Sequence, residues 1–336
     1  MKKFNVAIVG ATGMVGNKFL EVMEERLFSI GDLYLFASLN SAGKRITAFG
    51  KDYEVIPLTR EAVEKLDGKI DFALFSAGGA VSREYAPIFK GIGAVVVDNS
   101  SCWRMFEDVP LVVPEVNPED AFKHHGIIAN PNCSTIQAVV ALKPLYDEFG
   151  VKRIVFSTYQ AVSGAGVYGV EDLKERRTEP KKFARQIFDN VLPHIDAFEE
   201  DGYTKEEHKM INETRKILHD DNIRITATTV RVPVYYGHSE SINVEFIKPC
   251  TLDAVKTSLE NFRGLVVQDD PVHAIYPLPV YAEGRDEVFV GRIRLDDSVE
   301  SGINMWVVAD NIRKGAATNA VQIVELLIGE NPMKTI

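Results

Sequence analysis

The sequence predicts a two-domain α/β protein, in which a Rossmann-like doubly wound parallel sheet is followed by an α+β domain with a large mixed sheet. Three observations predict this fold class. The chain has 336 residues, more than a single hydrophobic core usually serves. Its first 100 residues alternate short apolar strands with helical periodicity, as βαβ units do. Beyond residue 150 the predicted strands are longer and the helices fewer.

The N-terminal elements follow from apolar runs and periodicity. Residues 4–9 form a continuous apolar run, which suits a parallel strand covered on both faces. Residues 14–28 predict a helix, and its apolar residues share one face: Val15, Phe19, Val22, Met23 and Leu27. Further strands are predicted over 33–38, 70–77 and 93–100. The start of the chain has a charged and then apolar character, but it runs into a glycine-rich turn, so we expect a buried strand rather than a signal peptide.

Cys133 stands between a predicted turn, Asn130-Pro131-Asn132, and a predicted helix that begins near Ser134. The amide groups and dipole of a helix N-terminus favour negative charge. A thiol placed there can have its pKa lowered from about 8.5 to roughly 3.5–7.5. The sequence at this point leaves two interpretations open, a reactive thiolate and a small buried apolar side chain. Pro144 is expected to kink or end the helix.

The second half of the chain predicts one large mixed or antiparallel sheet with helices on one face. Strands are predicted over 152–162, 223–236, 239–247, 287–296 and 302–310, with a polar helical region over 168–219. The tail predicts an amphipathic helix that could return to the first domain, with these contacts: Ala316, Ala317, Ala320, Ile323 and Leu326. We therefore expect residues 1–130 and 312–336 to form a dinucleotide-binding domain, and 131–311 a catalytic and dimerisation domain.

Composition excludes several classes of function. A formal net charge of −10 argues against a nucleic-acid surface, and it means that an anionic substrate needs local cationic residues. No apolar run approaches a membrane span. Three cysteines form no disulfide framework, which favours a reducing cytoplasm. The absence of paired-cysteine and His-Glu-x-x-His motifs predicts no metal site.

A glycine-rich turn predicts a dinucleotide cofactor. Gly10, Gly13 and Gly16 lie between the first strand and the first helix, where glycine permits a tight turn and close approach of the backbone to a pyrophosphate. An NAD site commonly carries an acidic residue after the second strand. This chain has none there, and hydroxyl, amide and cationic residues occupy the segment: Ser38, Asn40, Ser41, Lys44 and Arg45. The sequence therefore favours NADP.

A nucleophilic thiol needs an acid/base partner and, for an anionic substrate, cations. His238 is singled out among seven histidines because it follows Gly237, which separates two predicted strands. The cationic candidates are Arg104, Lys209 and Arg231. Glu206 lies three residues before Lys209 and hence on the same helical face, where a solvated ion pair is the simplest interpretation.

The chain contains ten characteristic segments, which are, in order, "GATGMVG", "SAGG", "NSSCWRM", "NPNCSTIQ", "TYQAVSGAG", "NVLPHID", "EEHKM", "VRVPVYYGHSE", "AEGRDEVFVGRIR" and "DNIRKGAATNAVQI". Together they resemble the bacterial type of aspartate-semialdehyde dehydrogenase over essentially the whole chain. The resemblance implies a glyceraldehyde-phosphate-dehydrogenase-like architecture and a cytoplasmic homodimer. The implied reaction is the reversible, NADPH-dependent conversion of 4-aspartyl phosphate to L-aspartate 4-semialdehyde and phosphate, on the route to lysine, diaminopimelate, methionine and threonine.

The resemblance also implies roles for individual residues. Cys133 matches the nucleophile that forms a thioester, and His238 matches the acid/base residue. Arg231 matches the partner of the substrate α-carboxylate, and Glu206 the partner of its α-ammonium group. The remaining substrate-binding residues are Arg104 and Lys209 for the phosphate and Asn132 and Gln160 for the acyl group. The expected cofactor-binding residues are Gly10, Ala11, Thr12, Gly13, Met14, Val15, Ser38, Ser41, Ser76, Gly78, Ser163, Gly164, Asn311 and Gly315.

Some alternatives stay open at this stage. Asn40 stands where many family members carry Arg, so use of NAD as well as NADP is possible. Cys102, beside Arg104, stands where a small residue is common, and it is either structural or able to form a disulfide with Cys133. The closest rival enzyme is N-acetyl-γ-glutamyl-phosphate reductase, although that family has "NPGCY" where this chain has "NPNCST". A glyceraldehyde-phosphate-type dehydrogenase is a more distant rival. An NADP-sensing binding protein is the non-enzyme alternative.

Overall fold

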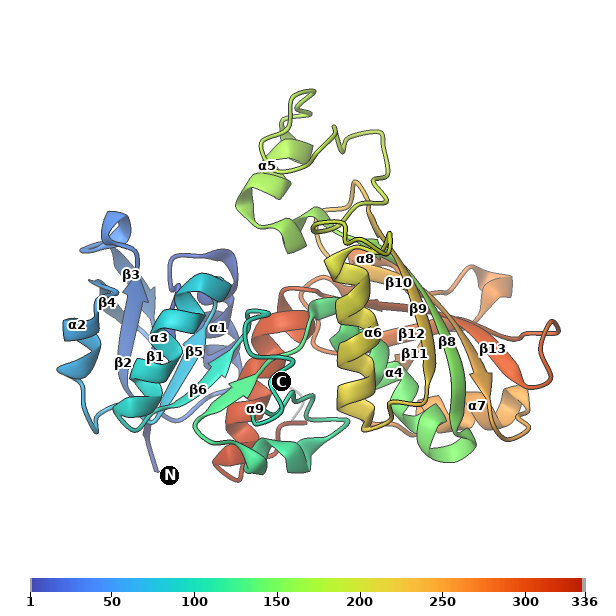
Figure 1. The fold of residues 1–336 in the computed structure, drawn as a ribbon, viewed down its shortest axis with the longest axis horizontal. Coiled ribbons are helices and arrows are strands. Elements are labelled where there is room, and N and C mark those ends of the chain that lie inside the picture. The colour runs from blue at the N-terminus through green and yellow to red at the C-terminus, as the bar shows by residue number, and fades with distance from the viewer. Residues whose placement is uncertain (1, 334–336) are drawn as a thin grey trace. The chain divides into compact units, whose positions relative to one another are not determined.

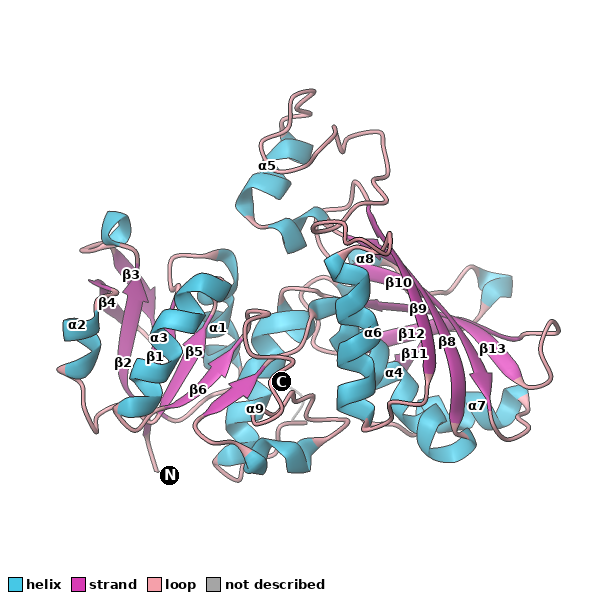
Figure 2. Ribbon diagram, in the orientation of Figure 1, coloured by secondary structure: helices cyan, strands magenta, loops and turns pink. Residues whose placement is uncertain are grey.

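The computed structural model describes residues 2–333, which fold into two compact units. Unit 1 comprises the residues up to Pro131 together with those from Ala316 onward, and unit 2 comprises Asn132–Gly315. Figure 1 colours the chain by residue number and Figure 2 by secondary structure. The predicted fold class is confirmed, because one unit holds a mostly parallel sheet and the other a mixed sheet.

Unit 1 is built on a seven-stranded sheet within the described residues, in the order β3-β4-β2-β1-β5-β6-β7. All neighbouring strands are parallel except β3 and β4. Short helices and loops connect the parallel strands, as expected of a doubly wound sheet. The strands are β1 (Phe4–Val9), β2 (Ile30–Ala37), β3 (Arg45–Ala48), β4 (Lys51–Pro57), β5 (Phe72–Phe75), β6 (Val95–Asp98) and β7 (Ile127–Ala129).

Helices cover both faces of this sheet. Consecutive strand residues point to opposite faces, so Leu35 and Leu74 join the core formed with α1 (Met14–Glu25) and α9 (Thr318–Leu327). Their sequence neighbours Phe36 and Phe75 instead meet Phe89 of α3 (Gly79–Gly91) edge to face. The other helical segments of this unit are η1 (Leu39–Ser41), α2 (Arg60–Glu64) and η2 (Pro118–Lys123).

The tail helix α9 packs in unit 1. Ala317, Ala320 and Ile323 are fully buried in the core that also contains α1 residues. A buried ion pair joins the two helices, with Arg26 Nη2 at 2.6 Å from Glu325 Oε2. A five-residue π-helical turn, Arg313–Ala317, precedes α9.

Unit 2 is built on a six-stranded mixed sheet within the described residues, in the order β11-β12-β13-β10-β8-β9. Figure 1 shows α4 (Cys133–Phe149), α6 (Lys205–Leu218) and α7 (Leu252–Glu260) on one face of this sheet. The strands are β8 (Val151–Gln160), β9 (Arg224–Arg231), β10 (His238–Phe246), β11 (Leu265–Val267), β12 (Val288–Leu295) and β13 (Gly302–Ala309). The remaining short helices are η3 (Val162–Ala165), α5 (Val167–Lys174), η4 (Pro271–His273) and α8 (Pro279–Ala282).

Four sequence-based expectations about elements were wrong or incomplete. Helix α4 does not end at Pro144 but continues to Phe149, because the surrounding helix is buried and its packing outweighs one missing N–H donor. Leu27 lies beyond α1, exposed and at φ 52°. Residues 175–204, inside the predicted helical region, hold no helix and only isolated β-bridges. Strands β3, β4, β7 and β11 are short or polar and were not predicted.

None of the helices among residues 2–333 combines the length and apolar character needed to cross a membrane.

Candidate active site

Cys133 is the first helical residue of α4, as the sequence predicted. Asn132 caps the helix, and its Oδ1 accepts hydrogen bonds from the backbone N–H groups of Ser134 (3.0 Å) and Thr135 (3.3 Å). The thiol therefore lies at the positive end of a 17-residue helix dipole. A Cβ atom at Gly315 would lie 2.9 Å from Cys133 Cβ, so only glycine lets the segment after β13 approach the cysteine this closely.

A buried carboxylate, Glu206, gathers three predicted substrate-binding residues. Its Oε1 accepts from Asn132 Nδ2 at 2.9 Å and from Gln160 Nε2 at 3.2 Å. Its Oε2 accepts from Lys209 Nζ at 3.1 Å. Burial alone would raise the pKa of Glu206, but Lys209, Asn132 and Arg231 together bring the pKa below its ordinary value. The Glu206–Lys209 pair is thus no solvated surface ion pair, since Glu206 is only 5% exposed.

The start of helix α6 positions Glu206 and Lys209. Thr204 and Glu207 form a reciprocal capping box, which fixes the first turn. Lys209 Nζ also contacts Asp196 Oδ2 at 2.7 Å. Burial would lower the pKa of Lys209, but Glu206 and Asp196 raise it above its ordinary value, so the amine stays charged.

Arg231 ends strand β9 and is buried. Its Nη1 donates to the carbonyl of Ala161 at 2.7 Å, and its guanidinium lies 6.0 Å from the ring centre of Phe183. Burial lowers the pKa of Arg231, whereas the charges of Glu206 and Cys133 raise it. Cys133, Glu206 and Arg231 therefore share one electrostatic environment.

His238 begins strand β10 directly after Gly237, which has φ +85°. The imidazole is fully buried, and its Nδ1 accepts from the backbone N–H of Ala161 at 3.0 Å. Burial, and then the charge of Arg231, hold the pKa of His238 well below its ordinary value. The ring is therefore neutral at pH 7, and with Nδ1 accepting, its proton lies on Nε2. Among the described residues Nε2 has no hydrogen-bond partner.

Two further predicted residues of unit 2 hold the loops around this group. Asn311 Nδ2 donates to Ser163 Oγ at 3.0 Å, and Asn311 Oδ1 accepts from Gly237 N at 2.9 Å. A Cβ atom at Gly164 would lie 3.0 Å from Arg231 Nη1 and 3.2 Å from His238 Nε2. A side chain at residue 164 would therefore crowd both functional groups.

The structure thus brings together the predicted residues of unit 2 in one group: Asn132, Cys133, Gln160, Ser163, Gly164, Glu206, Lys209, Arg231, His238, Asn311 and Gly315. A pocket of about 480 Å³ adjoins Arg231 and is lined by Phe183, Leu192, His194 and Asp196 among others.

Sequence reasoning missed several partners of these residues. Glu213 accepts from Asn132 N at 2.7 Å, and Asp196 holds Lys209. Glu240, two residues after His238, is fully buried, and burial followed by the charge of Glu206 raises its pKa well above its ordinary value. Asp196 stands in the quoted "NVLPHID" segment and could have been considered, but nothing local singles out Glu213.

The glycine-rich turn of unit 1 has the geometry of a phosphate-binding turn. Gly10 has φ +90°, and a Cβ there would lie 2.4 Å from the carbonyl oxygen of Ser76. A Cβ at Gly16 would lie 2.1 Å from the Gly10 carbonyl oxygen, so glycine allows α1 to pack against the end of β1. Gly13 is the N-cap of α1. The backbone therefore leads directly into a helix N-terminus, which attracts phosphate.

The other predicted residues of unit 1 lie at ends of its parallel strands. Ser38 follows β2 and Ser41 lies in η1, and no carboxylate occupies residues 38–41. Ser76 and Gly78 follow β5, and Gly78 caps α3 with φ +87°. Ala11 and Thr12 belong to the glycine turn, and Met14 and Val15 begin α1.

Arg104 lies in the loop after β6 and is buried. Its Nε donates to the carbonyl of Asn130 and its Nη2 to the carbonyl of Asn99, both at 3.0 Å. The nearby Cys102 carries an unbridged thiol, and burial raises its pKa.

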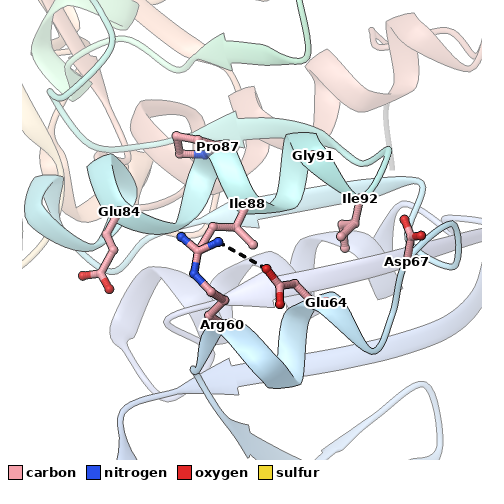
Figure 3. A pocket seen from close by; sticks show the side chains of 8 residues that line it. All are labelled: Arg60, Glu64, Asp67, Glu84, Pro87, Ile88, Gly91 and Ile92. Carbon is pink, nitrogen blue, oxygen red and sulfur yellow. Dashed lines mark hydrogen bonds and ion pairs between the residues drawn. The ribbon is translucent and has the colours of Figure 1, made fainter.

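Another pocket, of about 460 Å³, lies in unit 1 between α2 and α3 (Figure 3). Arg60 Nη1 and Glu64 Oε1 form an ion pair at 3.2 Å on its wall. None of the predicted cofactor-binding residues lines it.

Comparison with known proteins identifies the family. The model of the semialdehyde dehydrogenase NAD binding domain matches residues 5–124, and that of the dimerisation domain matches residues 142–314. A curated aspartate-semialdehyde dehydrogenase from Aquifex aeolicus is 61% identical, with 97% of this chain and 98% of the relative covered. The chain belongs to the aspartate-semialdehyde dehydrogenase family.

Other members of the aspartate-semialdehyde dehydrogenase family agree. The enzyme from Legionella pneumophila is 52% identical over 99% of this chain and 98% of its own. The crystal structure of aspartate semialdehyde dehydrogenase II from Vibrio cholerae has a TM-score of 0.93 at 49% identity, covering 98% of this chain and 99% of that chain. The family predicted from the sequence motifs is therefore confirmed, and the chain is an oxidoreductase of this family.

Proposed function

We propose that this chain catalyses the reversible NADPH-dependent reductive dephosphorylation of 4-aspartyl phosphate to L-aspartate 4-semialdehyde through a thioester on Cys133. The observation that carries the proposal is the placement of Cys133 at the N-terminus of α4, in one environment with Arg231, Glu206 and His238. A Vibrio cholerae relative at 48% identity was solved in complex with ASA, which supports the substrate.

The thiolate of Cys133 is the proposed nucleophile. The dipole of α4 and the charge of Arg231 both favour the anion. The sulfur attacks the acyl carbon of the substrate, the carbon–oxygen bond to phosphate breaks, and phosphate leaves with the electron pair. The resulting thioester divides one difficult reduction into two easier steps.

Arg231 and Glu206 are proposed to bind the α-carboxylate and the α-ammonium group. A guanidinium in a buried site suits a carboxylate, because its fork donates two parallel hydrogen bonds. Glu206 stays ionised through its contacts with Lys209, Asn132 and Gln160, so it can accept an ammonium. The same geometry disfavours an N-acetylated substrate, which lacks this positive charge.

Phosphate binding is assigned to Lys209 and Arg104, and positioning of the acyl group to Asn132 and Gln160. In the structure both amides donate to Glu206. When the substrate ammonium group binds Glu206, the side-chain N–H groups of Asn132 and Gln160 would become available to donate to the acyl oxygen of the substrate. Lys209 would likewise give up its contact with Asp196 or Glu206 and bind the phosphate, which carries more negative charge than a carboxylate.

His238 is proposed to act through its Nε2–H group. Since Nδ1 accepts the Ala161 N–H and the ring is neutral, Nε2 is a donor and not a base in this state. A donor there stabilises the oxyanion that forms when sulfur or hydride adds to the carbonyl carbon. If His238 also transfers a proton to or from the substrate oxygen, as the acid/base role requires, the charge of its ring must change during the reaction.

The turn between β1 and α1 fits a dinucleotide, because Gly10 and Gly16 leave no room for side chains and Gly13 is the N-cap of α1. Residues 10–15, together with Ser76, Gly78, Ser163, Gly164, Asn311 and Gly315, are proposed to hold it. Bound NADPH would supply the hydride for the reduction. The carbon–sulfur bond then breaks, which releases the aldehyde and regenerates the thiolate of Cys133. Ser38, Ser41 and the following Lys44 favour NADP over NAD, and a Candida albicans relative at 28% identity, TM-score 0.77, was solved with NADP.

We further propose a homodimer formed through unit 2, since the matching family model is named a dimerisation domain. Unbridged thiols at Cys102, Cys133 and Cys250 fit a reducing cytoplasm. The product would serve lysine, diaminopimelate, methionine and threonine biosynthesis.

The test is a phosphate-dependent assay in the reverse direction. Aspartate semialdehyde, phosphate and NADP should yield the absorbance of reduced nicotinamide, and replacing NADP by NAD should give a lower kcat/KM. Cys133→Ser should lower kcat by about 10³-fold or more, because the serine hydroxyl is a far weaker nucleophile here. Cys250→Ser, at a half-buried cysteine bonded to Ser301, is the matched control and should stay active. Substantial turnover by Cys133→Ser would remove Cys133 from the nucleophile's role.

A further inference from the structure

A chain of buried amide hydrogen bonds in unit 1 runs from helix α9 toward Arg104. Asn319 in α9 donates from Nδ2 to Asn130 Oδ1 at 2.7 Å and to the Val112 carbonyl at 3.0 Å. Asn130 in turn donates from Nδ2 to Asn99 Oδ1 at 2.7 Å. Asn130 and Asn319 have no exposed surface, so water does not compete for these bonds.

Asn130 is held on every side. Its backbone N–H donates to the Asp98 carbonyl at 2.8 Å, and its Nδ2 also contacts the Ala316 carbonyl at 3.2 Å. Its own carbonyl accepts from Arg104 Nε. The side-chain amide of Asn130 is thus held by Asn319 at its oxygen, and by Asn99 and the Ala316 carbonyl at its nitrogen.

Asn130 and Asn99 also hold the guanidinium of Arg104 through their backbone carbonyls. Nε bonds to the Asn130 carbonyl and Nη2 to the Asn99 carbonyl, both at 3.0 Å. Because a guanidinium is planar, two bonds from two different nitrogens fix both its position and its plane. A shift of Asn130 or Asn99 would tilt the remaining donors of Arg104.

We infer that Asn319 is a positioning residue for phosphate recognition, acting through Asn130 and Asn99 on the guanidinium of Arg104. The inference rests on the proposed function, in which Arg104 binds the phosphate. Arginine recognises phosphate by directed hydrogen bonds, so its angle matters as well as its charge. A substitution in α9 that touches neither substrate nor cofactor should therefore weaken phosphate binding selectively.

The decisive experiment measures KM for phosphate in the reverse assay with the full chain. Asn319→Leu keeps the volume and removes both hydrogen-bond donors. It should raise KM for phosphate about tenfold, since small misplacements of a binding group cost this much or more. KM for aspartate semialdehyde should change less than about twofold, because unit 2 supplies its proposed binding residues.

A double-mutant cycle with Arg104→Lys isolates the route of action. If Asn319 acts through Arg104, the double variant should have nearly the KM for phosphate of Arg104→Lys alone. Gln322→Met is the matched control, since Gln322 is a buried amide one turn along α9 that donates to the Pro332 carbonyl. It should lower the thermal midpoint and leave KM for phosphate unchanged.

The outcomes separate the inference from the proposed function. If Arg104→Lys raises KM for phosphate and Asn319→Leu does not, Asn319 is merely structural and the inference is wrong. Additive effects in the double variant would likewise overturn it. If Arg104→Lys itself leaves KM for phosphate unchanged, the proposed role of Arg104 fails, and the inference with it. Should Asn319→Leu not fold, Asn99→Ala breaks the same chain at a half-buried residue, and the same increase in KM is expected.

Discussion

The residues proposed to act directly are held by partners that are distant in the sequence. Glu206 is bonded by amides from residues 132 and 160, and Arg231 and His238 are joined through the backbone of Ala161. Each of these groups is buried, where an unsatisfied charge costs several kcal/mol. The site is consequently built before substrate arrives, and single substitutions should have specific effects.

At the residue scale, Arg231→Lys tests whether the guanidinium donates two parallel hydrogen bonds to the substrate α-carboxylate. Lysine keeps the charge but loses the planar pair of donors and the bond to the Ala161 carbonyl, so KM for aspartate semialdehyde should rise about tenfold or more. Steady-state kinetics at saturating phosphate and NADP measure it. Arg224→Lys, at an exposed position of the same strand, is the control and should leave KM unchanged. An unchanged KM in Arg231→Lys would make Arg231 structural.

At the scale of elements, the irregular segment that follows α5 is organised by one carboxylate. Asp172 Oδ1 accepts from Lys181 N at 2.9 Å, and Oδ2 accepts from Lys182 N at 2.7 Å and Phe183 N at 3.4 Å. Arg177 adds an ion pair at 3.1 Å. Burial would raise the pKa of Asp172, but these donors bring it below its ordinary value. The segment thus places Phe183 against Arg231 without a helix or strand.

Asp172→Asn should lower the free energy of unfolding by about 1–3 kcal/mol at pH 7, because several donors lose a charged acceptor. Since the folded-state pKa is depressed, this stabilisation is present above the unfolded-state pKa of about 3.9 and is lost as pH falls through the folded value. The difference between variant and parent should therefore vanish in acid. Urea unfolding at several pH values measures it.

The control for this prediction is Asp189→Asn in the same segment. Asp189 pairs with Arg176 at 2.6 Å, but both side chains are largely exposed, so the change should cost little. A stability difference in Asp172→Asn that persists unchanged below pH 3 would contradict the assignment.

At the scale of the whole molecule, unit 1 is completed by the last helix of the chain. Helix α9 buries Ala320, Val321, Ile323 and Val324 in the core shared with α1. The Arg26–Glu325 pair, with side chains at most 2% exposed, joins residues 299 positions apart. Folding of the N-terminal sheet core therefore depends on residues at the opposite end of the chain.

Glu325→Gln should lower the free energy of unfolding by about 3–5 kcal/mol, since it removes the negative charge that pairs with the buried Arg26 guanidinium. Replacing both partners, Arg26→Met with Glu325→Leu, should cost less than the single change. The exposed pair Lys18–Glu21 on the same helix α1 supplies the control, and Glu21→Gln should cost less than about 1 kcal/mol. Thermal and denaturant unfolding measure all three. Equal costs for Glu325→Gln and Glu21→Gln would refute the argument.

The local elements could be predicted because their determinants are neighbours in the sequence. The apolar run of β1, the glycine turn, the cap at Asn132 and the position of Gly237 before His238 each act within a few residues. Short strands such as β7 and β11 could not be predicted, since three residues carry no periodicity. The continuation of α4 past Pro144 depends on burial, which no local pattern reports.

The two sheet classes, the glycine-rich turn after β1 and the cysteine at a helix start could all be predicted from the sequence, because periodicity and backbone preferences are local. The protonation state of each buried group depends instead on how the chain folds. Glu206 is ionised although it is buried, because Lys209 of the same helix and Asn132 and Arg231 of other elements outweigh the effect of burial on its pKa. His238 is neutral because burial and the charge of Arg231 lower its pKa. Arg104 is held by a chain of amides that begins 215 residues further along the chain, at Asn319. Burial and charge pairing depend on which residues contact one another, and for residues distant in the sequence these contacts exist only in the folded chain.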